Sequence, residues 1–217
     1  MTSAPILKIC GMTRAEDVRE AVRLGADAIG FVLWERSPRC IGVDEAARIA
    51  SAIPPFVTRV GVFVDATPDD VAGAVREIGL DAVQLHGDET VEPYRHVGAR
   101  LIKAVAPATS QDVVEAIALP ADVGVLVDAR DEERRGGTGQ VANWAFAAEI
   151  AQSRPVILAG GISAQNVASA MAAVRPWALD ISSGVEESPG IKSHPRLREF
   201  FFAFESDISR PRRKRTL

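Results

Sequence analysis

A cysteine and a lysine near the N-terminus could together perform proton-transfer chemistry. Residues 6–10 form an apolar segment that predicts a strand, and alternation along that strand places Lys8 and Cys10 on one face. A thiolate can act as a base, but a free thiol with a pKa near 8.5 is only about 3% ionised at neutral pH. The Lys8 ammonium would favour the thiolate. Cys10 is therefore a candidate general base, and a buried, inert cysteine is the alternative.

A carboxylate at the end of another apolar segment could supply the acid. Asp128 ends residues 123–128, and a polar, glycine-rich loop separates it from the next predicted helix. Its alternative role is that of a helix cap or a loop carboxylate. Asp65 ends a similar segment but lies beside Thr67 and Pro68, so we expect it to cap a helix.

Eight short apolar segments must position these residues. Each is followed by a helical pattern, and Thr13 with Glu16 has the capping-box spacing for the first helix. Strands that are apolar on both faces predict a parallel sheet, and eight such units predict an α/β fold with a single (β/α)8 barrel. An open doubly wound sheet is the alternative. The predicted strands are residues 6–10, 26–34, 56–65, 80–87, 100–105, 123–128, 155–161 and 178–184.

In a closed barrel, the carboxyl ends of all strands meet at one mouth. Cys10 and Asp128, on strands one and six, would face each other across it. The loops after strands seven and eight, which form the usual phosphate site, would be residues 159–163 and 182–185, with a helix beginning near Ser163. Tight turns that bind nothing are the alternative. Lys8 and Asp180 both point inward on neighbouring strands, so we predict an ion pair between them. The residues expected at the mouth are Cys10, Trp34, Asp65, His86, Asp128, Gly160 and Ser182.

Six motifs, in this order, resemble the phosphoribosylanthranilate isomerase family of tryptophan biosynthesis. They are KICGMT at 8–13, SPR at 37–39, VQLHG at 83–87, LVDA at 126–129 with GGTG at 136–139, LAGGI at 158–162 with Asn166, and DISSGVE at 180–186. The resemblance covers residues 6–204. Two departures are ANW at 142–144, where the family more usually has FDW, and IKS at 191–193, where an acidic residue often follows the lysine.

The resemblance implies an activity and a role for each site residue. The activity is the Amadori rearrangement of N-(5-phosphoribosyl)anthranilate to 1-(2-carboxyphenylamino)-1-deoxyribulose 5-phosphate, by acid–base catalysis without metal or other cofactor. Cys10 would be the general base and Asp128 the general acid. Gln84 and His86 would either contact substrate or serve in packing. Arg39 would hold the anthranilate carboxylate, Asp180 would help form the site, and Gly160, Gly161, Ser182, Ser183 and Gly184 would hold the phosphate.

Composition restricts the function classes further. The chain has 217 residues, 47% of them hydrophobic, and a net charge of −4. We expect residues 1–206 to form the catalytic barrel and residues 207–217 a basic, disordered tail. The folded part is acidic, so a nucleic-acid partner is not expected. Two cysteines, three histidines and the lack of a long apolar run predict no disulfide framework, zinc site, signal peptide or membrane span, and therefore a cytoplasmic protein. The resemblance implies a phosphosugar ligand, and the sequence leaves open whether the protein is a monomer or a homodimer.

Two other functions were weighed against this one. A barrel that resembles ribulose-phosphate epimerase would need histidine and aspartate metal ligands at several strand ends, and only His86 is available. A non-catalytic phosphate-binding module would need the two glycine loops but would gain nothing from Cys10, Arg39 and Asp128 together.

Overall fold

The computed structural model describes residues 5–128 and 143–207 of the chain. The predicted glycine-rich loop after Asp128 and the predicted basic tail beyond residue 207 lie outside these residues. The described segments contain eight strands in one closed ring, and each strand pairs in parallel with its neighbours. The predicted (β/α)8 barrel is therefore confirmed.

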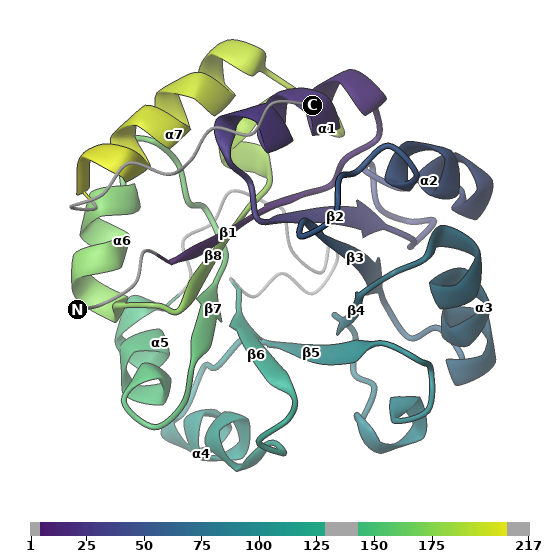
Figure 1. Cartoon of the computed structure of the whole chain (residues 1–217). Coiled ribbons are helices and arrows are strands. Elements are labelled where there is room, and N and C mark those ends of the chain that lie inside the picture. Colours follow the sequence, from purple (N-terminus) through teal and green to yellow (C-terminus); the bar gives the residue numbers. More distant parts are fainter. Residues whose placement is uncertain (1–4, 129–142, 208–217) are drawn as a thin grey trace.

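The strands are short and lie within the predicted apolar segments. β1 and β8 close the ring, with Lys8 in register with Asp180. Figure 1 shows the ring along its axis, with the helices outside it. The strands are β1 (Ile6–Cys10), β2 (Ala28–Val32), β3 (Thr58–Phe63), β4 (Ala82–Leu85), β5 (Arg100–Val105), β6 (Gly124–Val127), β7 (Val156–Leu158) and β8 (Ala178–Ile181).

The helices pack their apolar faces against the outside of the barrel. They are α1 (Ala15–Leu24), α2 (Val43–Ala50), α3 (Pro68–Ile78), the 3-10 turn η1 (Glu92–Tyr94), α4 (Ser110–Ala118), α5 (Trp144–Ala151), α6 (Val167–Val174) and α7 (His194–Asp207). After β8, where the sequence predicted a long loop, the chain forms the 3-10 turn η2 (Ser183–Val185) and a small antiparallel hairpin of β9 (Glu186–Ser188) and β10 (Ile191–Lys192).

The two predicted helix caps, Thr13 and Asp65, are both wrong. Thr67 caps α3 in place of Asp65, with its hydroxyl oxygen accepting from the Asp70 N–H. Thr13 instead donates to the Gly190 carbonyl at 2.6 Å, and α1 begins after Arg14 without a side-chain cap. Asp65 accepts from the Asp88 N–H at 2.8 Å, so it joins the loops after β3 and β4. In both cases the side chain that was expected to cap a helix instead bonds to a backbone group of a residue distant in sequence.

The first and last helices are joined by a buried carboxylate. Asp17 of α1 is fully buried, and its Oδ2 accepts from Arg14 Nε at 2.9 Å and from the Lys192 N–H at 3.0 Å. His194 Nε2, at the start of α7, lies 3.0 Å from Asp17 Oδ1. This contact fixes the β9–β10 hairpin and α7 against α1.

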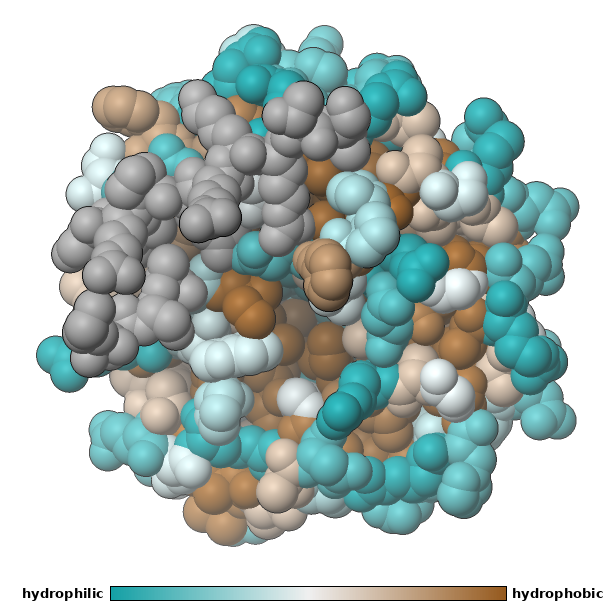
Figure 2. Space-filling view, viewed as in Figure 1, coloured by the Kyte–Doolittle hydropathy of each residue, from teal (hydrophilic) through white to brown (hydrophobic). Residues whose placement is uncertain are grey.

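Apolar side chains also fill the inside of the ring, so the barrel is not a channel. Seen along the axis in Figure 2, the molecule has a hydrophilic rim, and apolar side chains gather toward the middle. One internal cluster is Ala28, Val60 and Ala82; a second is Ala104, Leu126, Ile157, Ala159 and Ala178. The interior left above these clusters is where polar side chains can point inward.

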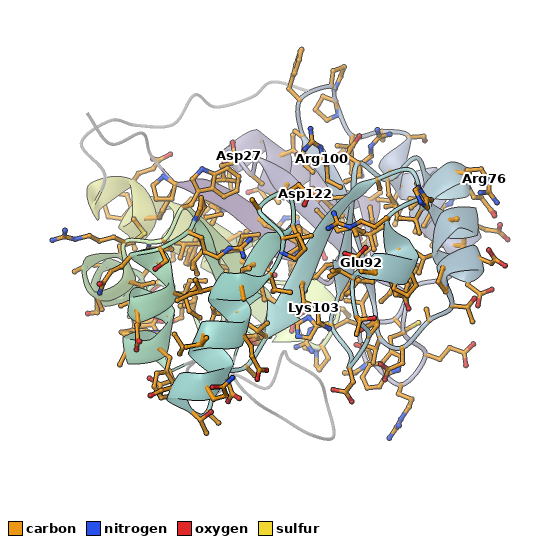
Figure 3. The ribbon with its side chains drawn as sticks, turned by 90° about the horizontal axis from the view of Figure 1, so that it is seen from below. Asp27, Arg76, Glu92, Arg100, Lys103 and Asp122 are labelled. Atoms are coloured by element: carbon orange, nitrogen blue, oxygen red, sulfur yellow. The ribbon has the colours of Figure 1, made fainter. Side chains whose placement is uncertain are left out.

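The side view shows which edge of the barrel is the mouth. Arg100, the first residue of β5, lies near the upper edge of Figure 3 together with Asp27 and Asp122, which come just before β2 and β6. Lys103, farther along β5, lies lower. All strands therefore run from the upper to the lower edge, and their carboxyl ends meet at the lower edge.

Candidate active site

A cavity of about 680 Å³, counting space open to solvent, lies at the carboxyl ends of the strands. It brings together residues from β1, β4, β6, β7, β8 and their loops. Ten of the eleven predicted site residues line it: Cys10, Arg39, Gln84, His86, Asp128, Gly160, Gly161, Asp180, Ser182 and Ser183. Gly184 is the exception among them, and Asp65, which was expected at the mouth, is also absent from the wall formed by the described residues.

The predicted ion pair lies at the floor of the cavity. Lys8 Nζ is 2.7 Å from Asp180 Oδ2, and both side chains are buried. Burial alone would lower the pKa of Lys8, but the negative charges of Asp180 and of an ionised Cys10 outweigh it, so this pKa is raised. Lys8 is therefore an ammonium, and the prediction from strand alternation is confirmed.

The Cys10 thiol lies in the same buried layer as Lys8. Burial raises the pKa of Cys10 above the ordinary value of a thiol, and the Asp180 charge raises it further. Lys8 and Lys192 act in the opposite direction, as the sequence predicted for Lys8, but they do not overcome burial. The thiol form therefore predominates at neutral pH, and a thiolate must be generated against this environment.

A glycine of the neighbouring strand makes room for the thiol. Gly30 of β2 is in register with Cys10, and a Cβ at position 30 would lie 2.7 Å from Cys10 Sγ and 3.1 Å from Lys8 Cε. No carbon atom fits at these distances. The sequence analysis missed this role, although Gly30 is a lone glycine inside an apolar strand, which often marks a close approach.

The candidate acid lies across the cavity at the end of β6. Asp128 is 8% exposed, and its Oδ2 is 3.4 Å from His86 Nε2. The other ring nitrogen, His86 Nδ1, is 2.7 Å from Gln84 Nε2. Gln84 Oε1 in turn accepts from Lys8 Nζ at 2.9 Å. A line of polar contacts thus joins Asp128 to Lys8, below Cys10.

Arg39 projects into the cavity and is held by a carboxylate that the sequence analysis did not identify. Arg39 Nε donates to Glu186 Oε1 at 2.8 Å and Nη2 donates to Oε2 at 2.5 Å. Lys192 Nζ donates to the same carboxylate at 2.8 Å. These cations lower the pKa of Glu186 although burial opposes them, and burial lowers the pKa of Lys192. Glu186 is the last residue of the DISSGVE motif, and Lys192 lies in β10. Nothing in their local spacing indicates that they meet Arg39.

The two glycine loops lie against each other beside the cavity. Gly160 and Gly161 have φ angles of 81° and 63°, in the left-handed region that glycine tolerates. Asn166 fixes their loop, since its Nδ2 donates to the Gly161 carbonyl at 2.8 Å and its Oδ1 accepts from the Ser163 N–H at 2.9 Å. The predicted helix start near Ser163 is therefore wrong: α6 begins at Val167, and the Ser163 N–H already has a partner.

Gly184 has a packing role between these loops. A Cβ at position 184 would lie 2.0 Å from the Ile162 carbonyl oxygen, so only glycine lets the loop after β8 reach the loop after β7. Beside this contact, Ser182 Oγ and Asp180 Oδ1 are buried and have no hydrogen-bond partner within the described residues. Buried polar atoms are normally satisfied, so these two oxygens indicate where a polar ligand binds.

The fold and this cavity define the class of (β/α)8 barrel proteins that bind a small anionic ligand at the carboxyl ends of the strands. The sequence model of the family described as N-(5'-phosphoribosyl)anthranilate (PRA) isomerase matches residues 7–203. The chain belongs to the phosphoribosylanthranilate isomerase family.

Relatives of known sequence or structure agree over nearly the whole chain. An N-(5'-phosphoribosyl)anthranilate isomerase of Pseudomonas fluorescens is 45% identical over 202 residues, which are 93% of this chain and 98% of the relative. The crystal structure of phosphoribosyl anthranilate isomerase from Thermotoga maritima has a TM-score of 0.85 at 37% identity, covering 93% of this chain and 99% of that one. A phosphoribosyl anthranilate isomerase in complex with reduced 1-(o-carboxyphenylamino)-1-deoxyribulose 5-phosphate has a TM-score of 0.82 at 36% identity, with the same coverage.

The described residues contain no group of three or more histidine, cysteine, aspartate or glutamate side chains that could hold a metal ion. Within the same residues, every helix is too short or too polar to cross a membrane.

Proposed function

We propose that this chain isomerises N-(5-phosphoribosyl)anthranilate with Cys10 as general base and Asp128 as general acid. The reaction follows from the family: it is the Amadori rearrangement of an aminoaldose to the aminoketose 1-(2-carboxyphenylamino)-1-deoxyribulose 5-phosphate in tryptophan biosynthesis. The roles of individual residues are our proposal, and they rest on the cavity described above.

The chemistry consists of proton transfers. Protonated Asp128 donates its proton to the ribose ring oxygen, and the C1–O bond breaks to give a Schiff base. The Cys10 thiolate then removes the proton from C2, which gives an enolamine. Protonation at C1 and loss of the C2 hydroxyl proton complete the aminoketose. Each matched acid or base typically contributes about 10² to 10⁴ to the rate.

The observation that carries this proposal is that Cys10 and Asp128 line the same cavity from strands three steps apart in the ring. The thiol is buried beside an ammonium, and the carboxylate contacts a histidine, so neither is an ordinary surface group. A ribose placed between them would have the Cys10 thiol on one side and the Asp128 carboxyl on the other. The two groups can therefore act on different atoms of one substrate.

Substrate binding is assigned to the remaining cavity residues. The phosphate binds beside Gly160, Gly161, Ser182 and Ser183, where the two glycine loops meet. Arg39 holds the anthranilate carboxylate, because Glu186 occupies Nε and Nη2 and thereby aims the guanidinium into the cavity. Asp180 Oδ1 accepts a sugar hydroxyl, which supplies its missing partner. A related isomerase binds the reduced product, which carries a phosphate and a carboxylate.

The test follows the loss of phosphoribosylanthranilate fluorescence with purified protein. Wild type should turn over, and Cys10→Ser and Asp128→Asn should each lower kcat at least about 100-fold. Cys40→Ser is the matched control, because the second free cysteine lies outside the cavity wall. Normal turnover by Cys10→Ser would remove the thiol from the mechanism, and no turnover by wild type would overturn the activity.

We also propose that the enzyme acts in the cytoplasm as a monomer or homodimer. A biosynthetic family and two unpaired cysteines support a reducing compartment. The Thermotoga maritima relative is described as dimeric, and monomers generated from it have been crystallised. Sedimentation velocity over a range of protein concentrations distinguishes the two forms for this chain.

A further inference from the structure

Along the contacts from Lys8 through Gln84 and His86 to Asp128, each donor and each acceptor is fixed by its neighbour. We propose that Gln84 holds His86 as the neutral ring with its hydrogen on Nε2, and that His86 is a positioning residue that directs this hydrogen toward Asp128 Oδ2, which lies 3.4 Å from Nε2. The effect is to keep the acidic proton of Asp128 on Oδ1. The proposal rests on the proposed function only in taking Asp128 as the acid.

Lys8 settles the orientation of the Gln84 amide. An ammonium has three donors and no acceptor, so the Gln84 atom 2.9 Å from Lys8 Nζ must be the carbonyl oxygen. Asp180, at 2.7 Å on the other side of Nζ, keeps Lys8 charged and in place. The NH2 group of Gln84 is therefore the atom that faces His86.

Gln84 in turn settles the protonation of His86. Its NH2 group can only donate hydrogen bonds, and its nitrogen lies 2.7 Å from His86 Nδ1, so Nδ1 must be the acceptor. A ring that accepts at Nδ1 carries its one hydrogen on Nε2, which lies 3.4 Å from Asp128 Oδ2. A doubly protonated ring would place two hydrogens between Nδ1 and the Gln84 amide. The imidazolium is thus excluded by the same contact that selects the tautomer.

This arrangement suits a carboxyl group that must act as an acid. A positively charged histidine beside Asp128 would favour the ionised carboxylate, which has no proton to donate. A neutral ring that turns its Nε2–H toward Oδ2 places no such charge there. Within the described residues, the charged group that bonds to this line is Lys8, which contacts Gln84 at one end and has Asp180 as its ion-pair partner. His86 therefore orients the acid without ionising it.

Nitrogen-15 NMR of the histidine rings tests the tautomer directly. The chain has three histidines, and His86→Gln and His96→Gln assign their signals by loss. In wild type at neutral pH, the His86 ring should show a protonated Nε2 and an unprotonated Nδ1. Gln84→Glu replaces the NH2 group by an oxygen, and the new acceptor should bring a proton onto His86 Nδ1. The same change at the exposed Gln111 of α4 should leave the His86 spectrum unaltered.

Kinetics test the consequence for the acid. Gln84→Glu should lower kcat at least about tenfold with a smaller change in KM, because the substrate contacts remain while proton donation weakens. His86→Gln keeps an N–H near the Nε2 position and should retain about ten times more kcat than His86→Leu. Gln111→Glu should have the kcat of wild type. A purely structural role would lower thermal stability in both His86 variants and would not distinguish their kcat values.

The outcomes separate this proposal from the assigned activity. A wild-type His86 with its proton on Nδ1, or an imidazolium at neutral pH, overturns the tautomer lock even if the enzyme turns over normally. Equal kcat for His86→Gln and His86→Leu overturns the positioning role. If wild type fails to isomerise the substrate, the activity is overturned, and the NMR spectra still decide whether Gln84 fixes His86.

Discussion

A methyl group at position 30 would lie 2.7 Å from the sulfur of Cys10, so Gly30 of β2 and the thiol of β1 share a space that only glycine leaves open. The same methyl group would lie 3.1 Å from Cε of Lys8. Lys8 and Cys10 are both buried, so a methyl group at position 30 would force at least one of them to shift. The position of the candidate base is thus set by a residue with no functional group.

Gly30→Ala should therefore displace the thiol and lower kcat at least about tenfold, because small misplacements of a catalytic group are costly. Steady-state kinetics measure the effect, and circular dichroism checks that the barrel still folds. Gly73→Ala in α3 is the control, since a Cβ there meets nothing within 4 Å. It should leave kcat unchanged and stabilise the fold by about 0.5–1 kcal/mol. Equal activity of the two variants would contradict the shared-space argument.

The ionisation of Cys10 should give the enzyme an alkaline activation limb. Burial raises the pKa of this thiol, so the thiolate fraction is small at neutral pH and grows as the pH rises toward that pKa. The value of kcat/KM should rise over the same range. The rate of Cys10 alkylation against pH, in a Cys40→Ser background, measures the thiol independently. A midpoint at or below that of free cysteine would show that Lys8 and Lys192 outweigh burial.

Glu186→Gln should weaken substrate binding more than it slows the reaction. Two nitrogens of Arg39 and the Lys192 ammonium donate to this carboxylate, and a neutral amide has only one oxygen and no charge with which to accept from them. Hydrogen bonds to charged groups contribute about 1.5–3 kcal/mol, so we expect KM to rise at least about tenfold. The neighbouring, exposed Glu187 provides the control Glu187→Gln, which should match wild type. An unchanged KM for Glu186→Gln would show either that Arg39 does not bind the substrate carboxylate or that Glu186 is not needed to hold Arg39.

Arg154→Ala should reduce stability and leave the active site intact. The guanidinium, just after α5, donates to five backbone carbonyls around the C-terminal end of α4, among them Leu119 at 2.7 Å and Val123 at 2.6 Å. Removing it leaves these carbonyls without their donor, so the free energy of unfolding should fall by at least about 1.5 kcal/mol. Urea unfolding measures the loss. Arg76→Ala, on the exposed side of α3, should change it by less than about 0.5 kcal/mol.

The sequence predicted the barrel and the Lys8–Asp180 pair because both depend on regular periodicity. Apolar runs on both faces require a parallel sheet, and alternation along β1 and β8 points both side chains inward. Both predictions depend only on the pattern within the strands and not on contacts made elsewhere in the chain. The two misplaced caps, Thr13 and Asp65, show the limit of local spacing, since Gly190 and Asp88 compete for them after folding.

The part of the site that could not be predicted depends on tertiary contacts. Arg39 and Glu186 are 147 positions apart and meet through a hairpin too short to give a strand signal. The direction of the Cys10 pKa shift depends on how burial balances two lysines, which no spacing reveals. The helix expected near Ser163 begins instead at Val167, and the Asn166 side chain bonds to the Ser163 N–H and the Gly161 carbonyl in the loop before it.

Closure of the ring between β1 and β8 constrains how the protein is made. On the ribosome, β1 emerges before the other seven barrel strands and has a single neighbour, β2, until residues 178–181 have been synthesised. Until then, one side of the nascent sheet carries free amide and carbonyl groups that could pair with another chain. The Asp17 contact with His194 also waits for the last helix. Native folding of the barrel can therefore finish only after β8 and α7 have been synthesised, and loss of α7 would leave Asp17 of α1 without its His194 contact.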